Sequence, residues 1–297
     1  MQGLSKKDEY LHEHGDRKDW RESFYFNWVD LKSGISGFST IGLLPNASKR
    51  EFVLALFYDD KREVHYSEPD GTVSEEIDAA LSDGVLSYGL VRPLKQWTLS
   101  YRGKALEADV KWTGRFPVFD FGSGSGTSWA GHFEQSGKVS GELRFPDGRT
   151  MSFRGLGERD KSWGARDWHI ESWYALHAQF DDLSIGLRRD VVHGEVHSSG
   201  GITTSDGQVA ISRIDLETEF VDKPMRMPLR AVTKVYGTDG SQYTLKSTLI
   251  SSNSFTRFAR QFPGGTTELF EEMATHSCAE TRKQGTGLIE WLLTHPS

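Results

Sequence analysis

Alternation of apolar and polar residues with a period of two is the feature that most constrains how this chain folds. Trp97, Leu99 and Tyr101 alternate with polar residues, and so do Ile214 and Leu216. A period of two places one face of a strand against a core and the other face in water. Turn sequences of the Asp-Gly type separate such runs, as in residues 69–71, 146–148, 205–207 and 238–240. The pattern predicts an antiparallel all-β sandwich or barrel.

Helical patterns are weak by comparison. Residues 73–81 fit either one short helix or a polar edge strand. Residues 267–279 carry apolar residues at helical spacing, but their threonines and their β-rich surroundings favour a strand.

The length of 297 residues predicts two domains, at about 150 residues per domain. Residues 97–116 and 227–250 each read as strand, turn and strand, which indicates a loose internal duplication. We place the boundary in the unusual segment near the middle of the chain. This gives an N-terminal domain of residues 1–165 and a C-terminal domain of residues 166–297.

Charge and cysteine content exclude several classes of protein. A net charge of −7 is poorly suited to binding nucleic acid or anionic lipid, because both would be repelled. Cys278 is the one cysteine, which excludes an intramolecular disulfide and a cysteine-rich zinc site. The first 20 residues are polar, and no run approaches 18 apolar residues. We therefore expect a cytoplasmic protein with no membrane span.

No cofactor motif is complete. Residues 122–126 are rich in glycine but lack the Rossmann spacing, so they predict a hairpin loop. His193 and His197 would share one face of a strand, but the sequence identifies no third metal ligand. A phosphate-binding loop and a GxSxG nucleophile elbow are also missing. The sequence therefore predicts neither a metal nor an organic cofactor.

The segment of residues 157–169 is the most unusual in the chain. It combines acidic, basic and tryptophan residues without strand or helix periodicity. Dense charge beside large aromatic rings indicates ion pairs under apolar cover, which shift pKa values and suit proton transfer. The alternative is a structural connector, in which Arg159 and Arg166 brace Asp160 and Asp167.

Two further segments carry candidate site residues. On a strand, His132 and Glu134 would share a face and could act as acid and base, although a solvated face of an edge strand is the alternative. In the second segment, Phe24 lies on an apolar face. Tyr25 and Asn27 lie on the opposite face, where they either line a pocket or meet water.

Residues 20–27, 34–38, 134–135 and 159–168 together resemble a bacterial family of tandem lipocalin-like proteins. That group is similar to the carotenoid 1,2-hydratases, the AttH-like proteins and the lipocalin-like Diels–Alderases. The most specific part is the run Arg-Asp-x-Ser-Trp-Gly-x-Arg-Asp-Trp at residues 159–168. The resemblance implies two tandem lipocalin-like β-barrel domains, an apolar pocket, and cofactor-free chemistry on terpenoid-, polyene- or polyketide-like molecules.

The hydratases carry a similar Asp-His-Asn-Trp-Gly run, which matches Asp160 to Gly164 here. Lys161 stands where histidine is usual. Paired with Asp160, Asp167 or Glu158, it would be a fixed cation. Desolvated, it could instead act as a base or form a Schiff base. The flanking acids favour the fixed cation.

These observations favour a cofactor-independent lyase, hydratase or isomerase that acts on a hydrophobic small molecule. Asp160 would donate or accept the proton, with its pKa set by burial against Trp163 and by neighbouring arginines. Lys161, His132 and Glu134 would be the further catalytic candidates. The expected substrate-contacting residues are Tyr25, Asn27, Trp163, Arg166 and Trp168.

Two other functions fit the same sequence. A non-catalytic carrier would need the apolar pocket but no titrating groups, and turnover of the ligand separates it from an enzyme. A structural interaction module would use the charged segment only to join the domains. Association into a homodimer is compatible with each of these functions.

Overall fold

The computed structural model describes residues 4–123, 129–166, 168, 170–220 and 227–296. Strands make up 68% of the structure and helices 4%, which confirms the all-β fold of two tandem barrel-like halves. The chain divides into two compact units, of which the N-terminal unit ends at Arg166. The domain boundary after residue 165 stays a prediction.

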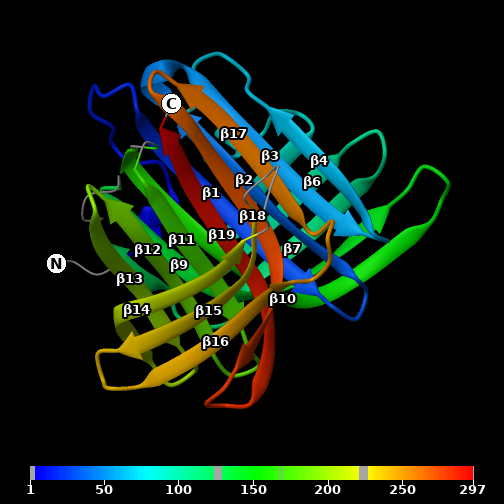
Figure 1. Ribbon diagram of the computed structural model, residues 1–297. Helices are drawn as coiled ribbons and strands as arrows, with labels where there is room; N and C mark the ends of the chain where they lie inside the picture. The colour runs from blue at the N-terminus through cyan, green and yellow to red at the C-terminus, as the bar shows by residue number, and fades with distance from the viewer. Residues whose placement is uncertain (1–3, 124–128, 167, 169, 221–226, 297) are drawn as a thin grey trace. The chain divides into compact units, whose positions relative to one another are not determined.

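The N-terminal unit is built on one open antiparallel sheet, a half-barrel, in the order β4-β3-β2-β1-β10-β9-β7-β6-β5, with β8 pairing to β9 (Figure 1). Because β1 and β10 lie at its centre, their residues have neighbours on both sides. The strands are β1 (Trp20–Asp30), β2 (Ile35–Leu44), β3 (Lys49–Tyr58), β4 (Lys61–Ser67), β5 (Leu86–Arg92), β6 (Gln96–Arg102), β7 (Glu107–Gly114), β8 (Phe119–Gly122), β9 (Gly131–Arg144) and β10 (Thr150–Ala165).

The core of this unit follows from the alternation along β1. Phe24, Phe26 and Trp28 are each 1% exposed and face inward. Phe26 contacts the rings of Trp97 and Trp112, with centroids 5.8 and 6.0 Å away. We call this side of the sheet the inward face.

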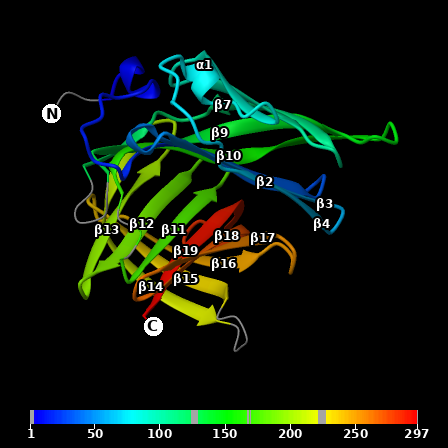
Figure 2. The same ribbon diagram turned by 90° about the horizontal axis from the view of Figure 1, so that it is seen from above.

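Three short helical segments accompany the sheet, namely η1 (Lys6–Glu9), η2 (Pro45–Ala47) and α1 (Ile77–Ala80). Of residues 73–81, which fit either a short helix or an edge strand, residues 77–80 form helix α1 (Figure 2). Its Ala80 is buried in the core of the N-terminal unit. No helix among the residues that the structure describes is long and apolar enough to span a membrane.

The C-terminal unit is a closed eight-stranded barrel within its described residues. Its sheet runs β16-β15-β14-β13-β12-β11-β19-β18-β17, and it closes because β16 also pairs with β18. The strands are β11 (Ser172–Gln179), β12 (Ser184–Val192), β13 (Glu195–Thr203), β14 (Gln208–Phe220), β15 (Pro228–Gly237), β16 (Gln242–Leu249), β17 (Phe255–Phe262), β18 (Gly265–Cys278) and β19 (Lys283–Pro296).

Several sequence predictions are decided by these strands. Residues 267–279 form most of β18, so the preference for a strand is confirmed. The two segments suggested as a duplication both fold as hairpins, β6–β7 and β15–β16. His193 and His197 would share a face only on one strand, and this condition is not met, because His193 lies in the turn between β12 and β13 with a φ of 52°.

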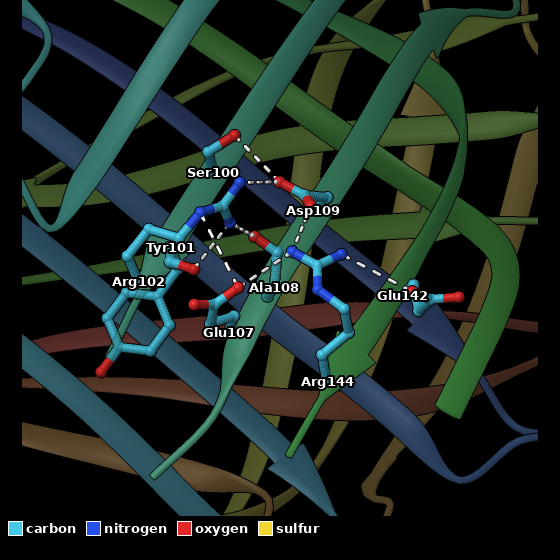
Figure 3. A network of polar contacts seen from close by, with 8 residues as sticks. All are labelled: Ser100, Tyr101, Arg102, Glu107, Ala108, Asp109, Glu142 and Arg144. Carbon is cyan, nitrogen blue, oxygen red and sulfur yellow. Dashed lines mark hydrogen bonds and ion pairs between the residues drawn. The ribbon is translucent and has the colours of Figure 1, made fainter. Parts of the chain in front are cut away.

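Strands β6, β7 and β9 also carry a network of surface charges (Figure 3). Arg144 donates to Asp109 at 2.6 Å and to Glu107 at 3.2 Å, and Arg102 donates to Asp109 at 2.7 Å. These side chains are 35 to 47% exposed, so water screens their interactions.

Candidate functional site

The charged segment of residues 157–165 is not irregular, as its sequence suggested, but forms the second half of β10. Strand β10 pairs with β1 on one side and with β9 on the other. Both of its faces are largely covered, so both need side chains suited to burial and no apolar–polar alternation is visible. The expectation that this segment is not a strand is therefore wrong for residues 157–165.

Arg159 points to the inward face and is 1% exposed. Its guanidinium donates to both carboxylate oxygens of Glu9, at 2.9 and 2.7 Å, and to the side-chain oxygen of Gln135 at 3.2 Å. Glu9 is fully buried at the end of η1. Arg159 thus anchors the N-terminal segment to the sheet instead of bracing Asp160, which is the first correction to the connector hypothesis.

Lys161 lies two residues further along the same face and is fully buried. Its Nζ donates to Glu22 of β1 and lies 4.1 Å from the ring centre of Phe24. We expected Asp160, Asp167 or Glu158 as its partner. That expectation is wrong, because Asp160 and Glu158 alternate onto the opposite face and Asp167 lies outside the described residues.

His12 completes this group from the N-terminal segment. Its backbone N–H donates to Glu22 Oε1 at 2.6 Å, and its ring stacks on Trp163 at 3.8 Å. Trp163 fits because Gly131 has no side chain, since a Cβ there would lie 2.2 Å from the indole ring. We call Glu9, His12, Glu22, Arg159 and Lys161 the interior ion-pair cluster.

Burial and pairing act in opposite directions in this cluster. Burial raises the pKa of the Glu22 carboxyl, but the Lys161 ammonium and His12 outweigh it, so that the net shift is downward. Burial also lowers the pKa of Lys161, against the pull of Glu22. The pair is held together by the mutual contact of its charges under apolar cover, which supports the fixed-cation role for Lys161.

The opposite side of the same sheet carries most of the predicted site residues, and we call it the polar face. Three rows of side chains cross β1, β10 and β9 in register there. The rows are Ser23–Ser162–His132, Tyr25–Asp160–Glu134 and Asn27–Glu158–Ser136. Cross-strand neighbours of this kind have Cβ atoms about 5 Å apart. The sheet therefore brings Tyr25, Asn27, His132, Glu134 and Asp160 together.

His132 and Glu134 are 5% and 4% exposed, and His132 Nε2 lies 3.5 Å from Glu134 Oε1. The His132 ring stacks on Phe121 at 4.5 Å and meets the edge of Trp129 at 4.7 Å. The alternative of a solvated edge strand is wrong, because β9 lies inside the sheet. The arrangement is an acid–base pair with aromatic walls.

Asp160 faces Tyr25 on one side and Glu134 on the other. We expected the side chain of Asp160 to pack against Trp163. That expectation is wrong, because the two residues are three apart on a strand and therefore lie on opposite faces. Arg166 directly follows the last residue of β10, and its guanidinium donates to Ser162 Oγ at 2.7 Å. That Arg166 braces Asp160 and Asp167 stays a prediction, and Asp167 lies outside the described residues.

Other predicted residues fall elsewhere. Trp168 belongs to the C-terminal unit, where its ring lies 5.4 Å from that of Trp173. His169 and residues 124–126 of the glycine-rich loop lie outside the described residues. Across the described part of the chain, no three His, Cys, Asp or Glu side chains are grouped to hold a metal ion.

Glu9, His12 and Glu22 were missed in the sequence. Glu22 carried a usable signal, because it shares the face of Phe24 and a carboxylate on an apolar face needs a buried partner. Glu9 and His12 carried none, because they belong to a polar segment without periodicity.

Comparison with known proteins agrees with the fold. Similar solved structures include a putative AttH from Nitrosomonas europaea (TM-score 0.67, 12% identity, covering 92% of each chain). They also include CghA with Sch210972 (0.66, 10% identity, 93% of this chain and 89% of that chain). A third is kievitone hydratase from Nectria haematococca (0.63, 12% identity, 93% and 89%).

The predicted resemblance is thereby confirmed at the level of the fold. No curated protein sequence matches the chain. One family, described as a domain of unknown function, DUF7064, matches residues 5–294. The chain belongs to this family.

Proposed function

We propose that the protein is a cofactor-independent lyase, hydratase or isomerase that acts by acid–base catalysis on a hydrophobic small molecule. The observation that carries the proposal is the buried pair of His132 and Glu134 between the rings of Phe121 and Trp129. A proton-transferring pair under aromatic cover suits a substrate that is apolar and has a reactive double bond or an acidic C–H. The hydratase among the solved structures of this fold is consistent with such chemistry.

The polar face supplies more than one titratable group, as proton-transfer chemistry requires. In a hydration, one group protonates a carbon of the double bond while a second accepts a proton from the attacking water, and elimination is the reverse. Asp160 and the His132–Glu134 pair take these two parts, because they lie on neighbouring strands of one face. Tyr25 and Asn27, in the adjoining positions, orient polar groups of the substrate.

Lys161 acts from the inward face as a fixed cation that stabilises the strand carrying Asp160. Its Nζ is bonded to Glu22, so it is not expected to form a Schiff base. Borohydride added during turnover should leave the peptide carrying Lys161 unmodified in mass spectrometry. A reduced substrate adduct on Lys161 would show that this lysine acts as a covalent catalyst and not as a fixed cation.

The experiment begins with the ligand that copurifies with the protein, identified by native mass spectrometry, and follows its conversion by the purified protein. His132→Gln and Asp160→Asn should each fold and lose turnover by about 10²- to 10⁴-fold, since this is the usual contribution of a general acid or base. His65→Gln is the matched control, because His65 also pairs with a carboxylate, that of Asp83 at 2.8 Å, but lies on β4 away from the polar face.

Two results would contradict the proposal. A ligand that binds and is recovered unchanged would make the protein a carrier. If His132→Gln and Asp160→Asn lost folded protein and turnover in the same proportion, the polar face would have only a structural role.

A further inference from the structure

The interior of the C-terminal barrel contains a carboxylic acid that the structure does not explain. Glu272 lies on β18 between Phe270 and Ala274, and all three side chains face inward. The rest of the interior around it is mainly apolar. Its buried members include Leu176, Leu187, Val235, Leu245 and Ile289.

Glu272 is fully buried, and neither of its carboxyl oxygens has a hydrogen-bond partner among the described residues. No cation in the described part of the chain forms an ion pair with it. Burial alone raises its pKa to about 9, so the group is a neutral acid at pH 7. A neutral carboxyl still needs a hydrogen-bond acceptor for its proton, and one buried without it is costly.

A second unsatisfied donor faces the same interior. Trp291 on β19 is 4% exposed, and its Nε1–H has no partner within the described residues. Residues of β18 and β19 pair in register, with Phe270 opposite Trp291 and Glu272 opposite Ile289. Figure 1 shows the two strands, orange and red, side by side. Glu272 and Trp291 are therefore diagonal neighbours on one face.

Two further pairs of polar groups inside this barrel have hydrogen-bond contacts. The Tyr174 hydroxyl lies 2.9 Å from Thr233 Oγ1, and Ser247 Oγ lies 2.8 Å from His276 Nδ1. All four residues are at most 2% exposed. His276 Nε2 also lacks a partner among the described residues, but His276 lies four residues beyond Glu272 along β18, about 13 Å away. Because buried polar atoms are usually paired, the two neighbouring unpaired groups of Glu272 and Trp291 need a physical reason.

We propose that the interior of the C-terminal barrel binds an uncharged, mainly apolar molecule through a carbonyl oxygen that accepts hydrogen bonds from Glu272 and Trp291. A carbonyl oxygen has two lone pairs and so matches two donors. The aliphatic and aromatic surroundings suit an apolar body and oppose a charged one. This site is built from the C-terminal unit alone and is distinct from the polar face of the N-terminal unit.

The first test uses Nile red, a neutral aromatic dye with a ring carbonyl, as the probe. The dye should bind the full-length protein with a blue shift of its emission. Glu272→Leu should weaken this binding at least tenfold and raise the melting temperature, because it removes a buried unpaired polar group. The same variant should keep its turnover of the substrate on the polar face, which separates this proposal from the proposed function.

The second test locates the ligand by nuclear magnetic resonance. The indole N–H signal of Trp291, assigned with Trp291→Phe, should move on addition of 2-octanone. The indole signal of Trp97 is the control, because Trp97 Nε1 is also buried and unpaired but lies in the N-terminal unit. This signal should stay in place.

Three outcomes would overturn the proposal. The first is that Nile red does not bind the protein, or that it binds Glu272→Leu as tightly as it binds the wild type. Another is a Trp291 signal that 2-octanone does not move. The third is stronger competition by octylammonium than by 2-octanone, which would show a cation site. If Glu272→Leu does not fold, Trp291→Phe takes its place in the dye titration and should likewise weaken binding.

Discussion

Glu22 in the N-terminal unit and Glu272 in the C-terminal unit are both buried carboxyl groups on the inward side of a strand, but only Glu22 has a cation beside it. Lys161 and His12 outweigh burial and lower the pKa of Glu22, whereas burial alone raises the pKa of Glu272 to about 9. The presence of a partner, and not the degree of burial, thus decides whether the group is charged. The paired group holds the fold together, and the unpaired group is available to a ligand.

The largest expected loss of stability comes from breaking one ion pair of the interior ion-pair cluster. Arg159→Met leaves the Glu9 carboxylate buried without its two hydrogen bonds from the guanidinium. Loss of one partner of a buried ion pair costs about 3–5 kcal/mol. We therefore expect the free energy of unfolding, measured by urea denaturation, to fall by about that amount.

The matched control removes an arginine from the surface network of Figure 3. Arg144→Met breaks contacts to Asp109 and Glu107, but those groups are exposed and regain water. Its unfolding curve should stay close to that of the wild type. Equal losses for Arg144→Met and Arg159→Met would show that burial does not distinguish the two networks. The double variant Glu9→Gln with Arg159→Met should recover much of the loss.

The next largest effect is a loss of stability with rising pH, which the unpaired carboxyl of Glu272 produces. Unfolded Glu272 ionises near its ordinary pKa of 4.5, whereas the folded protein keeps its proton up to about pH 9. Unfolding therefore releases a proton between these values, and stability falls as pH rises, by up to about 1.4 kcal/mol per pH unit. Glu272→Gln cannot titrate. Between pH 6 and 8 its stability should fall by roughly 2.7 kcal/mol less than that of the wild type.

Glu22→Gln sharpens the contrast on the acid side. The pKa of folded Glu22 is lowered, so its contribution is complete above pH 4.5 and is lost as pH falls through the folded value. The variant should be less stable than the wild type at neutral pH, and the difference should shrink in acid.

For Glu272, the contradicting outcome is a set of parallel curves of unfolding free energy against pH. If Glu272→Gln and the wild type gave such curves between pH 6 and 8, Glu272 would not be neutral in the folded protein.

The sequence predicted the fold well because most strands have one covered and one wet face. Trp97, Leu99 and Tyr101 on β6 are a clear example, with 0, 2 and 4% exposure beside more exposed neighbours. The same principle failed on β10, which is covered on both faces, so that Glu158 to Ser162 carried no visible period.

The candidate site was found in part for the same reason. The alternation in residues 131–135 was enough to place His132 and Glu134 on one face. The partners of Arg159 and Lys161 were not predictable, because Glu9 and Glu22 are more than 130 residues away in the chain and long-range pairing leaves no local pattern. Glu272 shares a face with Phe270, so the sequence itself indicates a carboxyl group that is buried in the core.

The smallest expected effect compares one buried tyrosine in each unit. The Tyr88 hydroxyl donates to Ser39 Oγ at 2.6 Å, and the Tyr174 hydroxyl lies 2.9 Å from Thr233 Oγ1. Replacing either tyrosine by phenylalanine removes one buried hydrogen bond and should lower the free energy of unfolding by about 1 kcal/mol. Thermal and urea denaturation of the two variants measure this loss.

The two variants should differ in ligand binding and not in stability. Tyr174→Phe changes the interior that holds Glu272, so it should weaken Nile red binding by a few-fold, since one hydrogen bond of the surrounding network is lost. Tyr88→Phe should leave dye binding unchanged, because Tyr88 lies in the core of the N-terminal unit and Ser39 keeps its bond to the Val53 carbonyl at 2.8 Å. If both variants weakened Nile red binding equally, the dye would report a general loosening of the protein. The binding data would then no longer support the contrast between the paired carboxyl of Glu22 and the available carboxyl of Glu272.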